Sequence, residues 1–509
     1  AILLCVCRAG PVTSGSAATH RQTHRMSRWE PQQPAPLESC AEVTVGCARL
    51  RVNRLLGEGS FGAVWSADLC DEADGEVAVK EIVCRSDAEF QRAAVERRLL
   101  EFVRASATEQ PDFARRCPAL VASEVHVLGP ECWLVRLVMT RIAGEPLSKL
   151  LGASEGAHAT ALAPGLGHPG GSLAAASRCA VSMLRQLAPT LEHVSTRAYH
   201  RDITPRNILV EMDAHGECSW GLVDFGLAVD TSSWEADFAS QDIGGDGLCW
   251  TTSAWYLFSH GSEELERSPD LLREYTSCLD MHSLGIAALR TFMELWAPGS
   301  HGTSGEELAK LLRLRDVWRN FWEDVNRFWQ PIFEACTCGS PGALDALKAS
   351  YANAGVHIIV SAGLCSIRAA LVQLRSVATI PDVRQLCDAL LVLIRPGKAR
   401  IQLPTWSAAK TALVEAFPPE EPLEHECGFV RGISSASALM ASDVYGDPWK
   451  GEVFFGNGVV EECTPPGTPS TQAGSIMEES MRSALSEYAD FLPSSEPMMA
   501  TVLPLVHVA

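Results

Sequence analysis

The sequence predicts an α+β fold in which a strand-rich N-terminal part precedes a longer, mainly helical part. Three observations predict it. Short runs rich in valine and isoleucine flank a glycine-rich break within residues 50–83. A helical pattern with apolar residues on one face covers residues 88–103, and strand-like runs return in residues 125–142. From about Leu173 onward, helical patterns dominate.

The composition limits the classes of protein that the chain can represent. Its 509 residues leave room for two to four domains at roughly 100–200 residues each. Hydrophobic residues make up 47% and charged residues 20%, which excludes wholesale disorder. The 42 basic and 62 acidic residues give a net charge of −20, which argues against binding to nucleic acids or anionic membranes. Only 7 of the basic residues are lysines, so the position of each lysine is informative.

The cysteines and the apolar runs indicate the compartment. The 18 cysteines form no paired C-x-x-C zinc motif, and a chain of this length needs no disulfides, so we expect a reducing environment. No apolar run approaches the roughly 20 residues that span a bilayer, and no basic segment precedes the apolar residues 1–7. We therefore expect no membrane span and no secretory signal, take Met26 as a plausible start, and predict an intracellular, cytoplasmic protein.

A glycine-rich segment opens the strand-rich part. Residues 56–64 have the sequence Leu-Gly-Glu-Gly-Ser-Phe-Gly-Ala-Val. A lone G-x-G-x-x-G is a weak signal, because glycines occur in many turns. Val64 and Trp65 continue in strand-like sequence instead of starting a helix, which disfavours a dinucleotide-binding motif. The alternative is a hairpin whose backbone N–H groups close over phosphates.

Lys80 ends the apolar run Glu-Val-Ala-Val-Lys. A lysine at the end of a buried strand needs an anionic partner. Glu96, 16 residues later on the predicted helix, is the expected partner, and Glu89 is the alternative.

Two further segments carry candidate catalytic groups. Asp202 and Asn207 lie five residues apart on a loop that enters an apolar strand. A carboxylate there can accept a proton from a hydroxyl, and an amide oxygen can bind a hard cation. Asp224, in Asp-Phe-Gly after a second apolar run, offers another carboxylate to a metal ion.

Taken together, these motifs resemble those of the eukaryotic protein kinases. The glycine loop, strand lysine, helix glutamate, H-R-D-x-x-x-x-N and D-F-G occur in the order found in that family. The resemblance covers about residues 50–417, roughly seven-tenths of the chain.

The resemblance implies a two-lobed architecture. It has a small antiparallel β-sheet N-lobe with one key helix and a larger, mostly helical C-lobe with insertions. Residues 1–45 are rich in Ser, Thr, Gln and Pro, and clusters of Pro, Glu, Gly and Ser follow Pro418, so both ends are predicted to be disordered. The expected organisation is a disordered lead (1–45), a protein kinase domain (46–417) with an N-lobe (about 46–142) and a C-lobe (about 143–417), a flexible insertion (152–172), a helical insertion (about 299–382) and a largely disordered tail (418–509).

The resemblance also implies a role for each matched residue. Asp202 would be the catalytic base, and Lys80, paired to Glu96, would hold the α- and β-phosphates of ATP. Asn207 and Asp224 would bind Mg²⁺. The residues expected to surround ATP are Gly57, Glu58, Gly59, Ser60, Phe61, Gly62, Val64, Ala78, Lys80, Met139, Ile142 and Leu209.

Further matches concern residues in the interior of the protein kinase fold that the sequence resembles. His200, Phe225 and Leu100 match the internal hydrophobic spine of an assembled kinase. Asp280, in Asp-x-x-Ser-x-Gly, matches the aspartate that holds the backbone of the catalytic loop.

Besides a longer interval between Asp202 and Asp224, the chain departs from the family pattern at two places. The usual lysine two residues after the catalytic aspartate is Thr204, and Arg206 is the candidate replacement for its charge. The family's A-P-E has become Leu-Phe-Ser, which removes the usual buried glutamate partner of Arg400. Glu263 and Glu264 are the candidate substitutes.

These features predict an ATP- and Mg²⁺-dependent protein kinase that phosphorylates serine or threonine in a protein substrate. Thr252 favours a serine or threonine acceptor, whereas the position of Arg206 just before Asn207 resembles the pattern of tyrosine kinases. Two alternatives stay open: a pseudokinase acting as a scaffold or allosteric module, and a kinase of small molecules. The acidic net charge favours substrates with basic segments. Arg201 is expected to pair with a phosphate added to the segment after Asp224. The sequence does not indicate the oligomeric state.

Overall fold

A computed structural model gives the fold of the central part of the chain. The described residues are 37–414 without 60–61, 72–74, 153–171, 214–216, 242, 298–304, 338–340 and 398–403. They all belong to one of the two compact units into which the chain divides. The predictions for residues 1–36, 153–171 and 415–509 lie outside the described residues.

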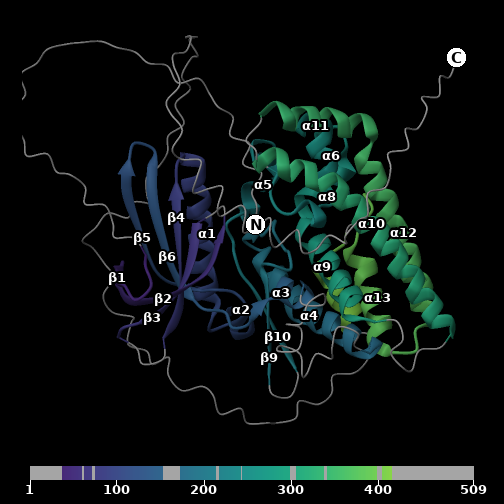
Figure 1. The fold of residues 1–509 in the computed structure, drawn as a ribbon, viewed down its shortest axis with the longest axis horizontal. Helices are drawn as coiled ribbons and strands as arrows, with labels where there is room; N and C mark the ends of the chain where they lie inside the picture. Colours follow the sequence, from purple (N-terminus) through teal and green to yellow (C-terminus); the bar gives the residue numbers. More distant parts are fainter. Residues whose placement is uncertain are drawn as a thin grey trace, which may run out of the picture. The chain divides into compact units, whose positions relative to one another are not determined.

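The N-terminal lobe is a six-stranded antiparallel sheet with the order β1-β2-β3-β4-β6-β5 (Figure 1). Its strands are β1 (Glu42–Val45), β2 (Ala48–Gly59), β3 (Gly62–Leu69), β4 (Glu76–Cys84), β5 (Leu120–Gly129) and β6 (Cys132–Thr140). Strand β1 corrects one expectation, because Val43 pairs with Leu50 of β2 and Val45 is fully buried. Residues 42–45 therefore belong to the sheet and not to the disordered lead predicted for 1–45. Only four residues of alternating pattern signal this strand, inside a polar segment.

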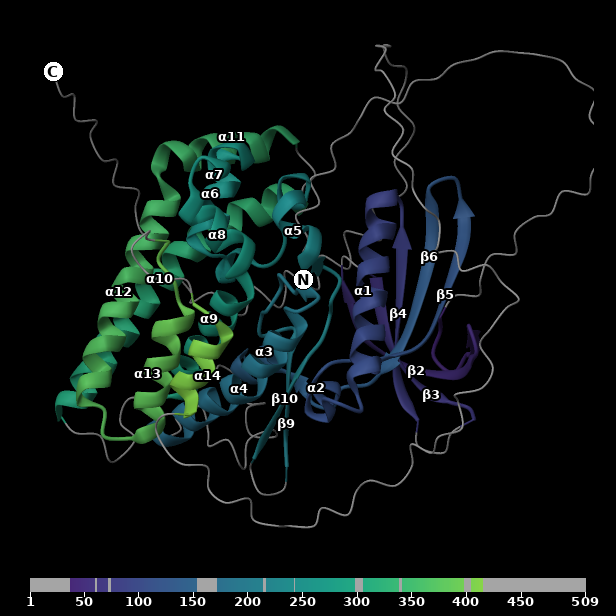
Figure 2. The ribbon, with the colours of Figure 1, turned by 180° about the vertical axis from the view of Figure 1, so that it is seen from behind.

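Helix α1 (Asp87–Ser106) packs against this sheet (Figures 1 and 2). It begins after Ser86, whose hydroxyl accepts a hydrogen bond from the backbone N–H of Glu89 at 3.3 Å. Its buried residues recur every three or four positions and include Glu96 and Leu100. The helix therefore carries one acidic side chain, Glu96, into the apolar layer between helix and sheet.

The C-terminal lobe is mainly helical. Its helices, with the connecting α2 between the lobes, are α2 (Pro111–Arg116), α3 (Leu147–Gly152), α4 (Leu173–Val194), α5 (Thr231–Asp237), α6 (Thr252–His260), α7 (Ser262–Glu266), α8 (Pro269–Ser277), α9 (Leu279–Leu295), α10 (Gly305–Thr337), α11 (Pro341–Ala354), α12 (Val356–Val377), α13 (Pro381–Leu393) and α14 (Trp406–Val414), with 3₁₀ turns η2 (Phe238–Ser240) and η3 (Gly247–Cys249). Its short strands are β7 (Glu145–Pro146), β8 (Ala198–Tyr199), β9 (Ile208–Met212), β10 (Cys218–Leu222) and β11 (Val229–Asp230). The two-lobed arrangement implied by the sequence is confirmed.

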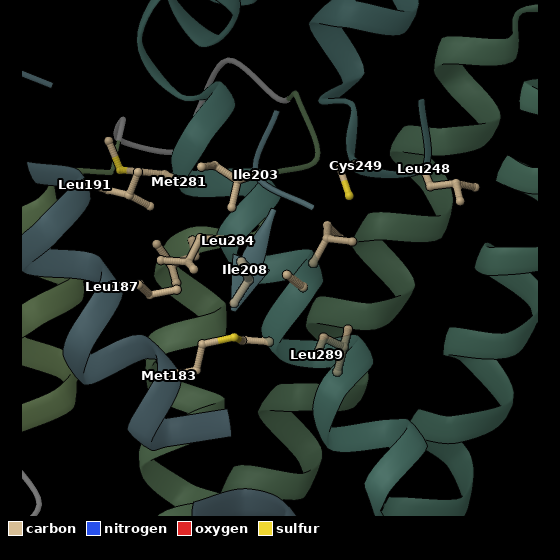
Figure 3. Packing of buried hydrophobic residues seen from close by; sticks show 14 of the residues in the cluster. Met183, Leu187, Leu191, Ile203, Ile208, Leu248, Cys249, Met281, Leu284 and Leu289 are labelled. Atoms are coloured by element: carbon tan, nitrogen blue, oxygen red, sulfur yellow. The ribbon is translucent and has the colours of Figure 1, made fainter. Parts of the chain in front are cut away.

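One apolar core joins α4, α9 and the loop that precedes β9 (Figure 3). Met183 and Leu187 of α4, Leu284 of α9, and Ile203 and Ile208 beside the loop are all fully buried. Because both ends of the loop are anchored in this core, the polar residues between Ile203 and Ile208 are held in fixed positions.

The insertion predicted within residues 299–382 is helical and comprises α10, α11 and α12. Helices α10 and α12 run side by side (Figures 1 and 2). The aromatic and aliphatic stripe of α10 is buried, and its members are Trp318, Phe321, Val325, Trp329 and Phe333. The ring of Trp329 lies 5.3 Å from that of Trp250, so the insertion packs on the segment that leads from Asp224 to α6.

Within the described part of the chain, α12 is the one helix long and apolar enough to cross a membrane by length and composition. Only 33% of its most apolar 18-residue window is buried, and Ile358 and Val372 are exposed. Core helices of soluble proteins meet the same criterion. The sequence-based expectation that no run of this kind exists is therefore wrong, although the helix alone does not indicate a span.

Candidate active site

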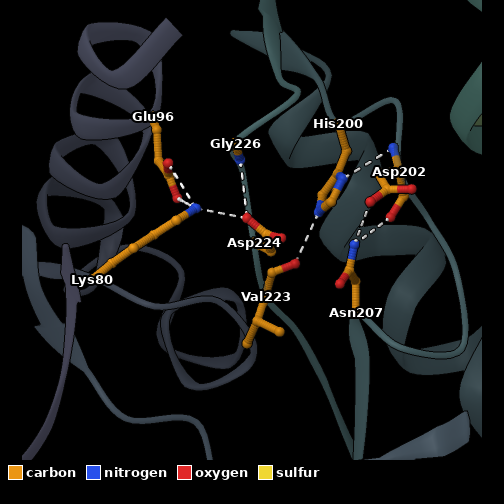
Figure 4. A network of polar contacts seen from close by, with 8 residues as sticks. All are labelled: Lys80, Glu96, His200, Asp202, Asn207, Val223, Asp224 and Gly226. Atoms are coloured by element: carbon orange, nitrogen blue, oxygen red, sulfur yellow. Dashed lines mark hydrogen bonds and ion pairs between the residues drawn. The ribbon is translucent and has the colours of Figure 1, made fainter. Parts of the chain in front are cut away.

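Lys80, Glu96 and Asp224 form a buried cluster of charges between the two lobes (Figure 4). The Lys80 Nζ atom lies 2.8 and 3.0 Å from the two carboxylate oxygens of Glu96 and 2.7 Å from Asp224 Oδ1. Lys80 is 4% exposed and Glu96 is 2% exposed. Glu89, the alternative partner, instead accepts a hydrogen bond from the backbone N–H of Arg85 at 2.6 Å. The structure therefore pairs Lys80 with Glu96.

The electrostatics of this cluster favour one cation between two carboxylates. Burial alone would lower the pKa of Lys80, but the charges of Asp224 and Glu96 outweigh burial and raise it. Burial would raise the pKa of Asp224, yet the Lys80 ammonium outweighs that effect and lowers it to about 2. Burial raises the pKa of Glu96, which Lys80 only partly opposes. Asp224 is thus firmly ionised, and its side chain is 28% exposed compared with 3% for Glu96.

Two residues of the site have backbone conformations that non-glycine residues rarely adopt. Arg201 has φ +65° and Asp224 has φ +67°. Such strain persists only where surrounding contacts enforce it, and it is concentrated at functional sites. Asp224 Oδ1 also accepts a hydrogen bond from the backbone N–H of Gly226 at 3.3 Å, which fixes the turn after it.

Asp202 and Asn207 face each other across the loop (Figure 4). The amide Nδ2 of Asn207 donates to Asp202 Oδ2 at 2.8 Å and to the Asp202 carbonyl oxygen at 3.0 Å. Asp202 Oδ1 is buried and has no hydrogen-bond partner. Burial raises the pKa of Asp202 above its usual value. The arrangement leaves one carboxylate oxygen available to accept a proton while Asn207 holds the other.

Asp280 of α9 anchors the backbone of this loop. Its Oδ2 and Oδ1 accept from the backbone N–H groups of His200 and Arg201, both at 2.7 Å. The His200 ring lies 5.1 Å from the Phe225 ring, and its Nε2 lies 3.2 Å from the Val223 carbonyl oxygen. These contacts tie the Asp202 loop to the Asp224 segment, so both acidic groups keep their relative positions.

The residues expected around ATP gather from strands of both lobes. Gly57 and Glu58 of β2 pair with Val64 and Ala63 of β3 in an antiparallel hairpin, which places the glycines at its exposed tip. Gly62 has φ +116°, and a Cβ there would lie 1.8 Å from the Glu81 carbonyl oxygen, so only glycine fits. Ser60 and Phe61 lie outside the described residues.

The sheet register places the other expected residues on one face. Val64 pairs with Lys80, and Ala78 pairs with Met139. Because directly paired residues and residues two apart share a face, Val64, Ala78, Lys80 and Met139 all point to the same side of the sheet. In the other lobe, Leu209 of β9 pairs with Gly221 of β10. Ile142 contacts that glycine as well, since a Cβ on Gly221 would lie 2.3 Å from Ile142 Cγ2.

The structure shows how Thr204 and Arg206, the residues of the first departure from the family pattern, are placed. Thr204 is buried, and its hydroxyl has no hydrogen-bond partner. Arg206 lies 3.2 Å from Asp246, in the segment between Asp224 and α6. Its charge is close enough to Asp202 to act against the burial-driven rise of that pKa. Arg206 is therefore a cation beside the catalytic loop.

Near the segment that replaces A-P-E, the structure shows a buried glutamate that the sequence analysis did not predict. Glu274 of α8 is 1% exposed, and its Oε1 accepts from the backbone N–H of Ser253 at 3.1 Å and from its hydroxyl at 3.2 Å. Burial raises its pKa to about 7, although Ser253 and the charge of Arg395 act against that rise. Glu274 thus ties α6 to the helical core. Only its burial distinguishes it from the other glutamates.

Glu263 and Glu264, the candidate partners of Arg400, both lie on α7. Glu263 is exposed on α7, and Glu264 on the same short helix pairs with Arg267. Arg400 lies outside the described residues.

The antiparallel sheet followed by a mainly helical lobe is the two-lobed fold of the protein kinases. Residues 50–253 match the family model of protein tyrosine and serine/threonine kinases. The match covers less than half of the chain and supports its membership of the protein kinase superfamily. No curated protein is similar enough to the chain to be matched.

Proposed function

We propose that this kinase transfers the γ-phosphate of ATP to a serine or threonine hydroxyl of a protein substrate. The observation that carries the proposal is the unpartnered Oδ1 atom of Asp202, beside an assembled Lys80–Glu96 pair. A hydroxyl that donates to this oxygen would pass its proton to the carboxylate as it attacks the phosphorus. The raised pKa of Asp202 makes the carboxylate a better proton acceptor.

The donor atoms fit Mg²⁺. Asp224 supplies an ionised carboxylate, and Asn207 supplies an amide oxygen opposite the Nδ2 that it uses to hold Asp202. No cluster of three or more His, Cys, Asp or Glu side chains that could hold a metal occurs among the described residues. Mg²⁺ sites of kinases use few protein ligands and depend on substrate phosphates, so this donor set suits them. When bound, Mg²⁺ would neutralise charge on the phosphates.

Lys80 and Arg206 would supply the positive charge that the protein itself contributes. Lys80 is held by Glu96 and aimed toward the site by its contact with Asp224. Arg206 would act in place of the lysine that Thr204 replaces, because its charge lies near Asp202. A preference for basic substrate segments and an intracellular location stay predictions from composition.

The test is phosphate transfer by the purified full-length chain with Mg²⁺ and labelled ATP, offered a set of proteins and a peptide library. The change Asp202→Asn is expected to lower transfer by roughly 10²–10⁴-fold, the usual contribution of a general base. Asp270→Asn, which alters an exposed acid paired with Arg273, is the matched control and should leave transfer unchanged. Analysis of the labelled amino acids would separate serine and threonine from tyrosine.

Three outcomes would contradict the proposal. Equal activity of Asp202→Asn and the unaltered chain would remove Asp202 from the chemistry. Nucleotide binding without transfer would support a pseudokinase, and transfer only to metabolites would support a small-molecule kinase.

A further inference from the structure

The segment from Asp224 to α6, here called the activation segment (residues 224–251), is fixed to the catalytic loop through Arg201. The Arg201 guanidinium carbon lies 4.6 Å from the centre of the Trp234 ring, which belongs to α5. Arg201 is 8% exposed and Trp234 is 1% exposed. A guanidinium over the face of a buried tryptophan is a favourable cation–π contact, stronger when it is shielded from water.

Two more aromatic residues surround this contact. The Tyr275 ring, on α8, lies 5.6 Å from the Trp234 ring and 6.0 Å from that of Phe238 in η2. Burial raises the pKa of the Tyr275 hydroxyl, and the Arg201 charge acts against that rise. Arg201 therefore lies beside aromatic rings from α5 and α8, the first of which belongs to the activation segment.

The far end of the activation segment also approaches Arg201 closely. Gly245 has φ +85°, and a Cβ there would lie 2.4 Å from the Arg201 carbonyl oxygen. A Cβ on Gly244 would lie 3.3 Å from the Arg201 guanidinium. The Trp250 indole N–H donates to the Gly244 carbonyl oxygen at 2.9 Å, which fixes this glycine turn. Two parts of the segment, α5 and the glycine turn, thus meet at one arginine.

In kinases controlled by phosphorylation, an arginine orders the activation segment by pairing with a phosphate added to it. The sequence predicts that role for Arg201. In the structure, the Trp234 indole covers the guanidinium. The Ser232 hydroxyl donates to Asp230 Oδ1 at 2.6 Å. A phosphate added to Ser232 would therefore be repelled by the Asp230 carboxylate.

We infer that Trp234 takes the place of an activating phosphate: it is a positioning residue that holds Arg201 and thereby orders the activation segment in the unphosphorylated enzyme. The inference rests on the proposed kinase function. Its consequence is that transfer does not require phosphorylation of the activation segment. Regulation would then act elsewhere than on this segment.

The experiment uses the full-length chain after phosphatase treatment, with the absence of phosphate verified by intact mass. Hydrogen exchange of peptides covering residues 225–258 is compared between the unaltered chain, Trp234→Ala and Trp234→Phe. The control is Trp318→Ala, which removes a buried tryptophan of α10 that is not part of the activation segment. Transfer rates and the KM for ATP are measured in parallel.

The unaltered, phosphate-free chain is expected to show a protected segment and full transfer. Trp234→Ala should speed exchange in residues 241–250 by about tenfold or more, as loss of a shielded cation–π contact implies. It should lower kcat while the KM for ATP stays constant, because Lys80 and the glycine hairpin are not involved. Trp234→Phe keeps an aromatic face and should restore most of both properties, and Trp318→Ala should not change exchange of the segment selectively.

Protection or transfer that appears only after phosphorylation of the segment would overturn the inference. So would a Trp234→Ala protein that is as protected and active as the unaltered chain. If the unaltered chain transfers no phosphate under any condition, the proposed function fails, whereas the exchange comparison still decides whether Trp234 orders the segment.

Discussion

Replacing Glu274 by glutamine tests how the buried Glu274 carboxylate anchors α6. Glu274 is almost fully buried, and its Oε1 accepts from both the backbone N–H and the hydroxyl of Ser253. Glutamine keeps a carbonyl oxygen for these donors and has nearly the same size. The change removes the charge and puts an amide NH₂ group in place of the second carboxylate oxygen.

The magnitude and its sign follow from the pKa. Burial raises the pKa of Glu274 from 4.5 to about 7, so the folded chain binds this proton more tightly than the unfolded chain. The stabilisation is fully present below about pH 4.5 and is lost as the pH rises through about 7. At about 1.4 kcal/mol for each pKa unit, ionisation costs about 3 kcal/mol above pH 7. Glutamine stays neutral, so Glu274→Gln should match the unaltered protein near pH 5 and exceed its stability near pH 8.

The assay is denaturant unfolding of the full-length proteins at both pH values, reported as the difference between variant and unaltered chain. Glu263→Gln, which alters an exposed glutamate on the neighbouring α7, is the control and should change stability by less than about 0.5 kcal/mol at either pH. The reasoning is refuted if Glu274→Gln is less stable at pH 8 than at pH 5 relative to the unaltered chain. That result would mean that the Arg395 charge holds Glu274 ionised.

Three other changes test the site. Lys80→Met leaves Glu96 and Asp224 without their shared cation, so it should lower the unfolding free energy by about 3–5 kcal/mol and abolish transfer. Denaturant unfolding measures the first effect and labelled ATP the second, and unchanged stability would contradict the buried cluster. Asp280→Ala leaves two buried backbone N–H groups without their acceptor and should destabilise the chain by about 1–3 kcal/mol while lowering kcat more than it raises KM. Thr204→Val removes a buried hydroxyl that has no partner and should leave stability and transfer unchanged. Arg206→Ala should lower kcat by about tenfold or more, because it removes the charge near Asp202. Equal kcat values for these two variants would exclude Arg206 as the compensating cation.

The local motifs of the sequence were sufficient to predict the core of the site. Lys80 and Glu96 are 16 residues apart on a strand and the following helix, and the structure pairs them at 2.8 Å. Asp202 and Asn207 lie on one short loop, so their spacing alone brings them together. The α+β order of strands before helices also follows from periodicity, because a strand and a helix present their apolar residues at different intervals.

Residues that act through distant contacts were beyond sequence reasoning. Glu274 and Trp234 resemble many other glutamates and tryptophans in the chain, and only the packing of α8 against α6 and α5 against Arg201 gives them a role. The expectation that Glu263 or Glu264 would pair with Arg400 stays a prediction, because Arg400 lies outside the described residues. Both are on a short surface helix, whereas α8 turns its glutamate inward.

The sequence by itself therefore determined which chemical groups this kinase carries and in which order, since those groups are coded within short segments. The tertiary structure decided how the segments are held: which carboxylate Lys80 contacts across 144 residues, what covers Arg201, and which acid anchors α6. The physical reason is that burial and charge pairing depend on neighbours brought together by packing. A side chain's pKa, its partners and its freedom to move are consequently set only once the core has formed.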